Sequence, residues 1–328
     1  MYRRLALLLS LPLTLTAADK KPAASPTAGI KTPGVQIPIA SLKPEAALDA
    51  APVWIGVADL LLVPNAAKGS LDRLDPKKNE IGDAVPAVSK PCGGTVSAFG
   101  SVWVPSCDDH SLVRIDPKKW EVAARIATGA GSAPLAIAAG ADSVWLFSDN
   151  RTTLSRVDPD QNQVVAELRL PAGCSALVFG EAALWAACPN EDRVLRINPQ
   201  SNLVEKQIEV SARPRMLAAG EGSIWVLCEK DGKVDRIDPK TNKVSKTIEL
   251  SVPGVTGAIA AGLGSIWVTL EGFPLTRIDP QSEKAVQQFY GTGGGAIQIG
   301  ANALWLSNTR DGTLWRLDPK RVQATLAE

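Results

Sequence analysis

The chain has 328 residues, of which 45% are apolar and 21% charged, so it can bury a sizeable core and is not globally disordered. Its formal net charge is +1, and the charge falls to −1 without residues 1–18, which hold Arg3 and Arg4 and no acidic residue. This near neutrality argues against nucleic acid or an anionic membrane surface as the main partner.

The chain begins with the features of a secretory signal peptide. Arg3 and Arg4 precede an apolar run from Leu5 to about Leu15, which is too short to span a bilayer comfortably, and small residues follow. We therefore expect residues 1–18 to be removed on export. Residues 19–33 are rich in Pro, Ala and Lys and predict a flexible tether. The expected location is periplasmic or secreted, with no membrane insertion after signal removal.

A repeated unit fills the rest of the chain. The string Arg-x-Asp/Asn-Pro recurs at nearly equal spacing, at Asp75, Asp116, Asp158, Asn198, Asp238, Asp279 and Asp318. A tryptophan lies twelve or thirteen positions before the last six of these, at Trp103, Trp145, Trp185, Trp225, Trp267 and Trp305. Self-similarity with a period of roughly 40 residues is typical of solenoids and propellers.

Each unit contains four short strand-like runs separated by turn signals. In the fifth unit, residues 216–219, 223–227, 234–237 and 244–250 are the strands, and Gly-Glu-Gly, Glu-Lys-Asp-Gly and Asp-Pro are the turns. Both faces of the inner strands are apolar, so each sheet needs a neighbour on either side. A ring satisfies this need. The predicted fold is all-β, a seven-bladed β-propeller of four-stranded antiparallel blades spanning residues 34–328.

The first unit and the closure of the ring are predicted less directly. We assign Trp54 as the seventh tryptophan; it lies twenty-one positions before Asp75, which implies an insertion around LLLVPNAAKG. Residues 34–48 align with residues 206–220, an outermost strand followed by the next innermost strand. We therefore expect residues 34–40 to pair into the last blade and close the ring, with the C-terminal VQATLA segment as the alternative source of that strand.

The cysteine spacing predicts two disulfides. Cys92 and Cys174 each lie eleven positions before a tryptophan, and Cys107 and Cys188 lie four and three positions after one. This places each pair on neighbouring strands of one hairpin, so we expect Cys92–Cys107 and Cys174–Cys188 bridges. Such bridges agree with export. Cys228 is left over and is expected to be a buried free thiol.

The units, with P-x-x-I/L-A-A-G-x-G-S-I/V-W-V followed by K-V-x-R-I-D-P-x-T-N-x-V, resemble the YVTN-type and virginiamycin B lyase-like seven-bladed propellers. The resemblance implies the fold for essentially the whole chain. It also implies a magnesium-assisted elimination that uses histidines in the last blades and a nearby glutamate. This sequence departs from that pattern, because the matching positions hold Arg215, Gly257, Gly295 and Thr309.

Without those ligands the elimination lacks a general base and metal support, so we expect a non-enzymatic platform that binds a small molecule or a protein at the mouth of the ring. The mouth is formed by the loops after the second strands and the loops that enter each blade. The candidate binding residues are Asp108, Asp109, His110, Arg151, Arg213, Arg215, Glu229, Lys230 and Arg310. The Gly293–Gly295 run allows either close approach of a ligand or a plain turn.

The alternative is a metal-assisted lyase or hydrolase whose site has moved to Asp108, Asp109 and His110, the only histidine. This set is short of ligands, because metal sites of this type use further histidines. We expect no catalytic residue, no metal and no cofactor, with magnesium only under the lyase alternative. The expected oligomeric state is a monomer.

Overall fold

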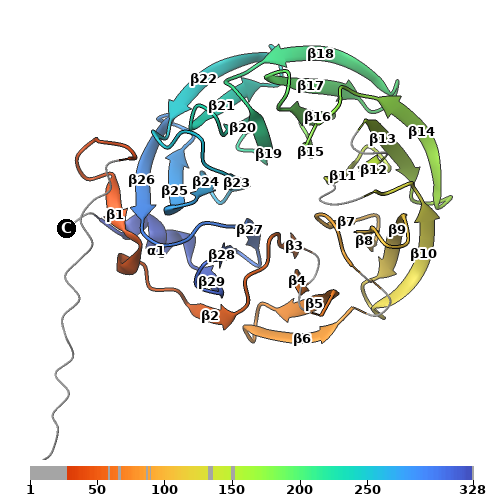
Figure 1. The fold of residues 1–328 in the computed structure, drawn as a ribbon, viewed down its shortest axis with the longest axis horizontal. Helices are drawn as coiled ribbons and strands as arrows, with labels where there is room; N and C mark the ends of the chain where they lie inside the picture. Colours follow the sequence, from red (N-terminus) through yellow and green to blue (C-terminus); the bar gives the residue numbers. More distant parts are fainter. Residues whose placement is uncertain are drawn as a thin grey trace, which may run out of the picture.

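A computed structural model describes residues 28–57, 60–65, 68–85, 88, 90–131, 136–148 and 152–326. Seven sheets are arranged in a ring, each running from the centre to the rim, which confirms the predicted seven-bladed propeller (Figure 1). The expected signal peptide lies outside the described residues. In the described part of the chain, no helix is both long and apolar enough for a membrane span.

We number the blades 1 to 7 by their innermost strands. These are β3 (Gly56–Val57), β7 (Val96–Ala98), β11 (Ile137–Gly140), β15 (Ala176–Gly180), β19 (Pro214–Gly220), β23 (Gly257–Gly262) and β27 (Ile297–Gly300). The second strands are β4 (Leu61–Asn65), β8 (Ser101–Ser106), β12 (Ser143–Ser148), β16 (Ala183–Cys188), β20 (Ser223–Cys228), β24 (Ser265–Leu270) and β28 (Ala303–Asn308).

The third strands are β5 (Ser70–Asp75), β9 (Ser111–Asp116), β13 (Thr153–Asp158), β17 (Arg193–Asn198), β21 (Lys233–Asp238), β25 (Phe273–Asp279) and β29 (Thr313–Leu317). The outermost strands of blades 1 to 6 are β6 (Glu80–Ala84), β10 (Glu121–Ala127), β14 (Gln163–Arg169), β18 (Leu203–Glu209), β22 (Lys243–Glu249) and β26 (Lys284–Tyr290). Second strands of blades 2 to 7 are buried along their whole length, because a neighbouring blade covers each face.

An N-terminal strand closes the ring. Strand β2 (Ala46–Asp49) pairs antiparallel with β29 and is the outermost strand of blade 7. The expectation that residues 34–40 fill this place is wrong, because β1 (Gln36–Pro38) pairs in parallel with β26 as a fifth strand of blade 6. A short 3-10 turn, η1 (Ile39–Ser41), separates the two strands. The C-terminal segment does not supply the strand, since it forms helix α1 (Pro319–Ala324).

The misplaced closing strand has its cause in blade 1. Leu62 lies opposite Arg73, as Trp103 lies opposite Arg114 in blade 2, so Leu62 and not Trp54 holds the tryptophan position. Strands β4 and β5 therefore follow the ordinary spacing, and blade 1 has no insertion there. Because Trp54 was taken as the repeated tryptophan, the innermost strand of blade 1 was predicted too early in the chain. The strand that closes the ring was therefore predicted too early as well.

The described part of the expected tether, residues 28–33, is bound to the propeller. The Gly29 amide donates to the Ser251 carbonyl at 2.9 Å, and the Ile30 amide donates to Gln288 Oε1 at 2.8 Å. The Gln288 side chain is fully buried and its Nε2 donates to the Leu250 carbonyl at 3.0 Å. These bonds leave residues 28–33 as part of the fold, which corrects the predicted boundary at residue 34.

The repeated Arg, Trp and Asp-Pro residues join neighbouring blades. In blade 5 the Arg236 guanidinium stacks on Trp225 at 5.3 Å and donates from Nη1 to the Pro280 carbonyl in the turn of blade 6. The same Nη1 donates to Glu283 at 2.8 Å, where most other blades have an asparagine in the left-handed region. The repeat is therefore explained by inter-blade packing, as predicted.

The aspartate of each Asp-Pro turn accepts hydrogen bonds from backbone amides. Asp238 Oδ1 accepts from the Lys240 amide at 2.8 Å, and this bond is the main reason that the pKa of Asp238 lies below its usual value. Asp75, Asp116, Asp158 and Asp279 show the same lowered pKa for the same reason. These carboxylates stabilise the turns through hydrogen bonds, so their recurrence in the repeat needs no bound metal as an explanation.

Candidate functional site

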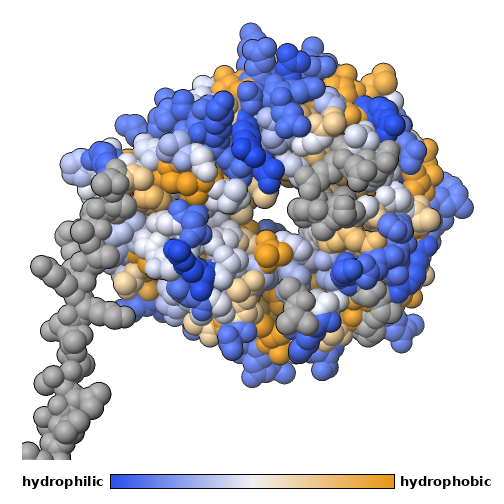
Figure 2. Space-filling view, viewed as in Figure 1, coloured by the Kyte–Doolittle hydropathy of each residue, from blue (hydrophilic) through white to orange (hydrophobic). Residues whose placement is uncertain are grey.

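A cleft of about 230 Å³ lies at the mouth of the ring, at the end where blades begin and second strands finish. We call it the mouth cleft. It is lined by Val53, Met216, Thr256, Gly257, Ala258, Glu271, Gly294, Gly295, Ala296 and Thr309. Val53 and Met216 are 73% and 37% exposed, and Figure 2 shows apolar surface beside the central opening. The mouth therefore combines exposed apolar groups with polar ones, as ligand sites do.

Glycines form much of the mouth cleft because backbones lie against one another there. A Cβ on Gly257 would clash with the Thr269 carbonyl oxygen, and one on Gly295 would lie 2.6 Å from the Ser307 carbonyl oxygen. Gly294 has φ +139°, and its Cβ would lie 2.6 Å from the Leu270 carbonyl oxygen. Close backbone packing requires glycine at these positions. At two of them, Gly257 and Gly295, the lyase resemblance implies histidines, and the packing leaves no space for such a side chain.

Arg215 and Glu229 face each other on blade 5. Arg215 is unpaired in the ladder between Pro214–Cys228 and Met216–Leu227, so it is a β-bulge, a feature that redirects a side chain. Its Nε lies 3.7 Å from Glu229 Oε2, and the Glu229 side chain is only 7% exposed. Burial raises the pKa of Glu229, and the charges of Arg215 and then Arg213 partly oppose this rise.

This pair is not fully satisfied by hydrogen bonds. The separation of 3.7 Å is too long for a hydrogen bond, and the buried Arg215 Nε has no hydrogen-bond partner within the described residues. A buried acid with a raised pKa beside a guanidinium is a pattern common at functional sites, and it also occurs in structural ion pairs. Arg215 and Glu229 are therefore two predicted site residues whose charged groups the structure places side by side.

Three carboxylates hold the loop that carries Arg213 and Arg215. The consecutive backbone amides of Ser211, Ala212 and Arg213 donate to three different aspartates, namely Asp235 at 2.6 Å, Asp231 at 2.8 Å and Asp192 at 2.7 Å. Arg213 lies in the left-handed region with φ +61°. The loop is therefore tied to blades 4 and 5 before Arg215 begins its strand. None of these aspartates was among the candidate residues of the sequence analysis, and Asp235 stood in the predicted strand 234–237.

The candidate residues of blade 2 each have a partner outside their own set. Asp108 pairs with Lys90 at 2.9 Å and Asp109 with Arg125 at 2.8 Å. His110 lies in the left-handed region with φ +51°, and its Nδ1 donates to the Ala130 carbonyl at 2.8 Å. These bonds explain the loop as a turn of blade 2, and its three residues are not among those that line the mouth cleft.

The remaining predicted residues lie at different places. Arg310 Nη1 is 3.5 Å from Glu271 Oε1, so Arg310 belongs to the margin of the mouth cleft. Lys230 is exposed beside Glu229. Arg151 lies outside the described residues. Glu271, Val53 and Met216 line the mouth cleft but were not among the predicted residues. Of these, Glu271 could have been found from the sequence, because it begins the loop 271–274 after the second strand of blade 6, and such loops were predicted to form the mouth.

The cysteine predictions are confirmed. Cys92 is bonded to Cys107 and Cys174 to Cys188. Cys228 is free and fully buried, and burial raises the pKa of its thiol, with a further rise from the nearby Asp235 charge. Two disulfides are typical of proteins from oxidising environments.

The residues at the mouth do not fit the magnesium ion of the lyase resemblance. The aligned positions hold a guanidinium and two glycines, and the nearest carboxylates, Glu229 and Glu271, each face an arginine. Within the described residues, no three His, Cys, Asp or Glu side chains come together in a way that could hold a metal ion. A cation there would meet Arg215 and Arg310 without compensating ligands.

The comparisons with known proteins show the fold. No protein-family model matches the sequence, and no curated protein matches it. Among solved structures, the chain is similar to a streptogramin B lyase, with a TM-score of 0.68 and 18% identity over 82% of this chain and 93% of that chain. Virginiamycin B lyase from Staphylococcus aureus gives a TM-score of 0.68 and 18% identity over 83% and 97%.

A hydrazine synthase from Kuenenia stuttgartiensis is also similar, with a TM-score of 0.59 and 14% identity over 71% of this chain and 78% of that chain. At these identities the likeness concerns the fold alone. The chain thus has the fold of the virginiamycin B lyase-like seven-bladed β-propellers.

Proposed function

We propose that this protein is an exported, non-enzymatic β-propeller that binds a small molecule or a protein segment at its mouth cleft. The observation that carries the proposal is the pairing of exposed Val53 and Met216 with the polar groups Glu271 and Thr309 in one cleft. An apolar contact area with a few convergent polar groups gives a ligand both affinity and orientation. Rigid blades hold these groups in place, since the loops extend from fully paired sheets.

The arrangement favours binding over elimination chemistry. A metal-assisted elimination needs a general base and a metal bound close to the reacting atoms. At the aligned positions the chain has Arg215, Gly257 and Gly295, and a side chain on either glycine would clash with backbone. Burial raises the pKa of Glu229, and the facing Arg215 fits an ion-pairing role for this carboxyl.

Ligand screening with a matched pair of variants tests the proposal. Val53→Asp places a charge in the mouth cleft, and Leu203→Asp places one at a similarly exposed aliphatic position on outer strand β18. A fragment and peptide library is screened by ligand-observed NMR against the wild-type protein. We expect ligands whose binding is lost in Val53→Asp and kept in Leu203→Asp. Equal loss in both variants, or no ligand at all, contradicts the proposal.

Two further measurements examine export and the absence of catalysis. Cell fractionation with and without residues 1–18 tests export, and retention of the full-length chain in the cytosol contradicts it. Incubation with a cyclic depsipeptide, followed by chromatography for the ring-opened product, tests for turnover. Chelator-sensitive turnover that is lost in His110→Ala would establish the relocated lyase and remove the non-enzymatic proposal.

A further inference from the structure

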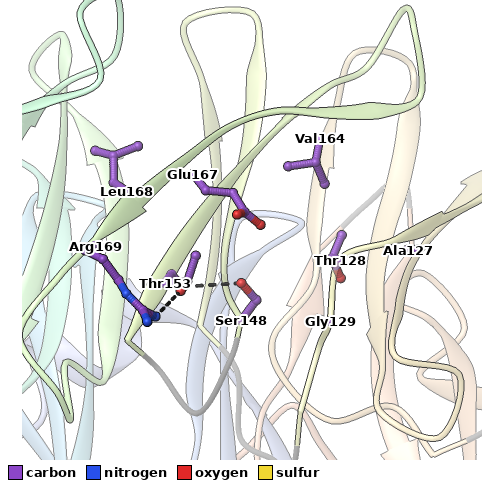
Figure 3. Close-up of a pocket in the computed structure, with 9 residues that line it drawn as sticks. All are labelled: Ala127, Thr128, Gly129, Ser148, Thr153, Val164, Glu167, Leu168 and Arg169. Carbon is purple, nitrogen blue, oxygen red and sulfur yellow. Dashed lines mark hydrogen bonds between the residues drawn. The ribbon is translucent and has the colours of Figure 1, made fainter.

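A second, larger cleft lies between the outer parts of blades 2 and 3, away from the mouth cleft. Its volume is about 600 Å³, and none of its lining residues lines the mouth cleft. Blade 2 contributes Ala127, Thr128 and Gly129, and blade 3 contributes Ser148, Thr153, Val164, Glu167, Leu168 and Arg169 (Figure 3). We call it the rim cleft. This volume is ample for a small ligand, for which protein sites measure about 300–1,000 Å³.

The rim cleft is hollow because blade 3 presents small hydroxyl residues to blade 2. Ser148, Thr153 and Arg169 form one row across the sheet, and Ser155 and Glu167 belong to the next row on the same face. In blade 4, the position that corresponds to Thr153 is Arg193. The short Thr153 side chain lines the cleft and leaves space that a longer side chain would occupy.

Thr128 leaves a polar atom unsatisfied in this space. The residue is 6% exposed, and its Oγ1 has no hydrogen-bond partner within the described residues. A buried hydroxyl without a partner costs about 1–3 kcal/mol. By contrast, Ser148 Oγ contacts Ser155 Oγ at 2.8 Å, and the Arg169 guanidinium donates to Thr153 Oγ1 at 2.9 Å. Figure 3 shows Thr128 across the cleft from Ser148 and Glu167.

The charges of the lining define the class of ligand. The lining holds one carboxylate, Glu167, and one guanidinium, Arg169, two residues apart on the same strand face, so that their Cα atoms are about 7 Å apart along the strand. An anionic ligand is attracted by Arg169 and repelled by Glu167, and a cationic ligand the reverse, so the pair favours neither sign of net charge. A neutral ligand with many hydroxyl groups meets neither penalty, because each hydroxyl both donates, as Glu167 requires, and accepts, as Arg169 and Thr128 require.

We propose that the rim cleft binds a neutral saccharide of one or two rings. Its hydroxyls bond to Thr128 Oγ1, Glu167 and Arg169, and a C–H face packs on Val164. The site is independent of the mouth cleft. A free sugar and the end of a longer glycan share this chemistry, so the measurement below uses both.

The test combines calorimetric titration with two conservative variants. Wild-type protein is titrated with neutral mono- and disaccharides, with their longer oligosaccharides, and with glucosamine and glucuronate as charged probes. Thr128→Val keeps the shape and removes the hydroxyl, and Glu167→Gln removes the charge. Glu209→Gln, on the outermost strand of blade 4, is the matched control. We expect both cleft variants to weaken binding about tenfold or more, and the control to leave it unchanged.

The melting temperature of Thr128→Val separates binding from folding. Because the hydroxyl has no partner in the described structure, we expect this variant to melt at the wild-type temperature or above it. An oligosaccharide that binds more tightly than its monosaccharide identifies a glycan, and equal affinity identifies a free sugar; either result supports the site. The proposal is overturned if no neutral saccharide binds, if a charged probe binds better, if the cleft variants bind normally, or if Thr128→Val melts clearly lower.

Discussion

Replacement of Asp235 by alanine tests the physical account of the loop that carries Arg213. Asp235 is 1% exposed, and its carboxylate accepts hydrogen bonds from the Ser211 amide at 2.6 Å, from Ser211 Oγ at 3.1 Å and from Thr247 Oγ1 at 2.7 Å. Asp235→Ala removes both carboxylate oxygens, and with them all three hydrogen bonds, at once. The Ser211 amide then has no partner, and this costs about 1–3 kcal/mol.

The two hydroxyls lose less, because each can rotate toward another acceptor or water, and we assign about 0.5–1 kcal/mol to each. The free energy of unfolding should therefore fall by about 3 kcal/mol, a large share of the roughly 5–15 kcal/mol typical of folded domains. Urea unfolding followed by tryptophan fluorescence measures this change. The control is Asp160→Ala, an exposed turn position, for which a change within about 0.5 kcal/mol is expected. A loss below about 1 kcal/mol for Asp235→Ala would refute the reasoning, because it would show that the donors have other partners.

Three further predictions concern the mouth and the free thiol. Burial raises the pKa of Glu229, so its ionisation opposes folding: the stability it contributes is complete below its unfolded-state pKa and is lost as pH rises through the folded-state pKa. Glu229→Gln should thus raise the melting temperature at pH 7 and have little effect at pH 3; an equal effect at both values contradicts the assignment. Gly257→His should lower the free energy of unfolding by more than about 2 kcal/mol in a urea titration, because its Cβ clashes with the Thr269 carbonyl; wild-type stability would show that the strand moves aside. Cys228 should react with a thiol reagent only after unfolding, because it is fully buried and its thiol pKa is raised; rapid labelling of the native protein would disprove this burial.

The number of blades and their strands could be predicted because the signal is local and repeated. Each Arg-x-Asp-Pro string marks a turn whose geometry depends on the Asp and Pro themselves, as the Asp238 bonds show. The disulfides were predictable for a related reason. Hairpin pairing brings Cys174 close to Cys188, whatever the rest of the ring does.

The first blade could not be placed from the same signal. Leu62 replaces the repeated tryptophan, and Trp54 lies close enough in sequence to be mistaken for it. Arg73 then stacks on Trp120 from blade 2, at 5.3 Å, in place of a tryptophan from its own blade. The spacing of thirteen positions before Asp75 points to Leu62, but a leucine lacks the aromatic side chain that marks this position in the other blades.

The sequence by itself thus determines the four-stranded blade, because a β-hairpin is decided by residues a few positions apart. It also shows that each sheet must be covered by another sheet on both sides, because both faces of each inner strand are apolar. The site is different. Glu271 meets Arg310, and Val53 meets Met216 across the cleft, only because closure by β2 brings blades 1, 5, 6 and 7 around one opening. Likewise, the Thr128 hydroxyl has no partner among the described residues because of the side chains that the neighbouring blade presents. Distances between separate blades depend on how the whole ring closes, so they cannot be inferred from any single stretch of the sequence.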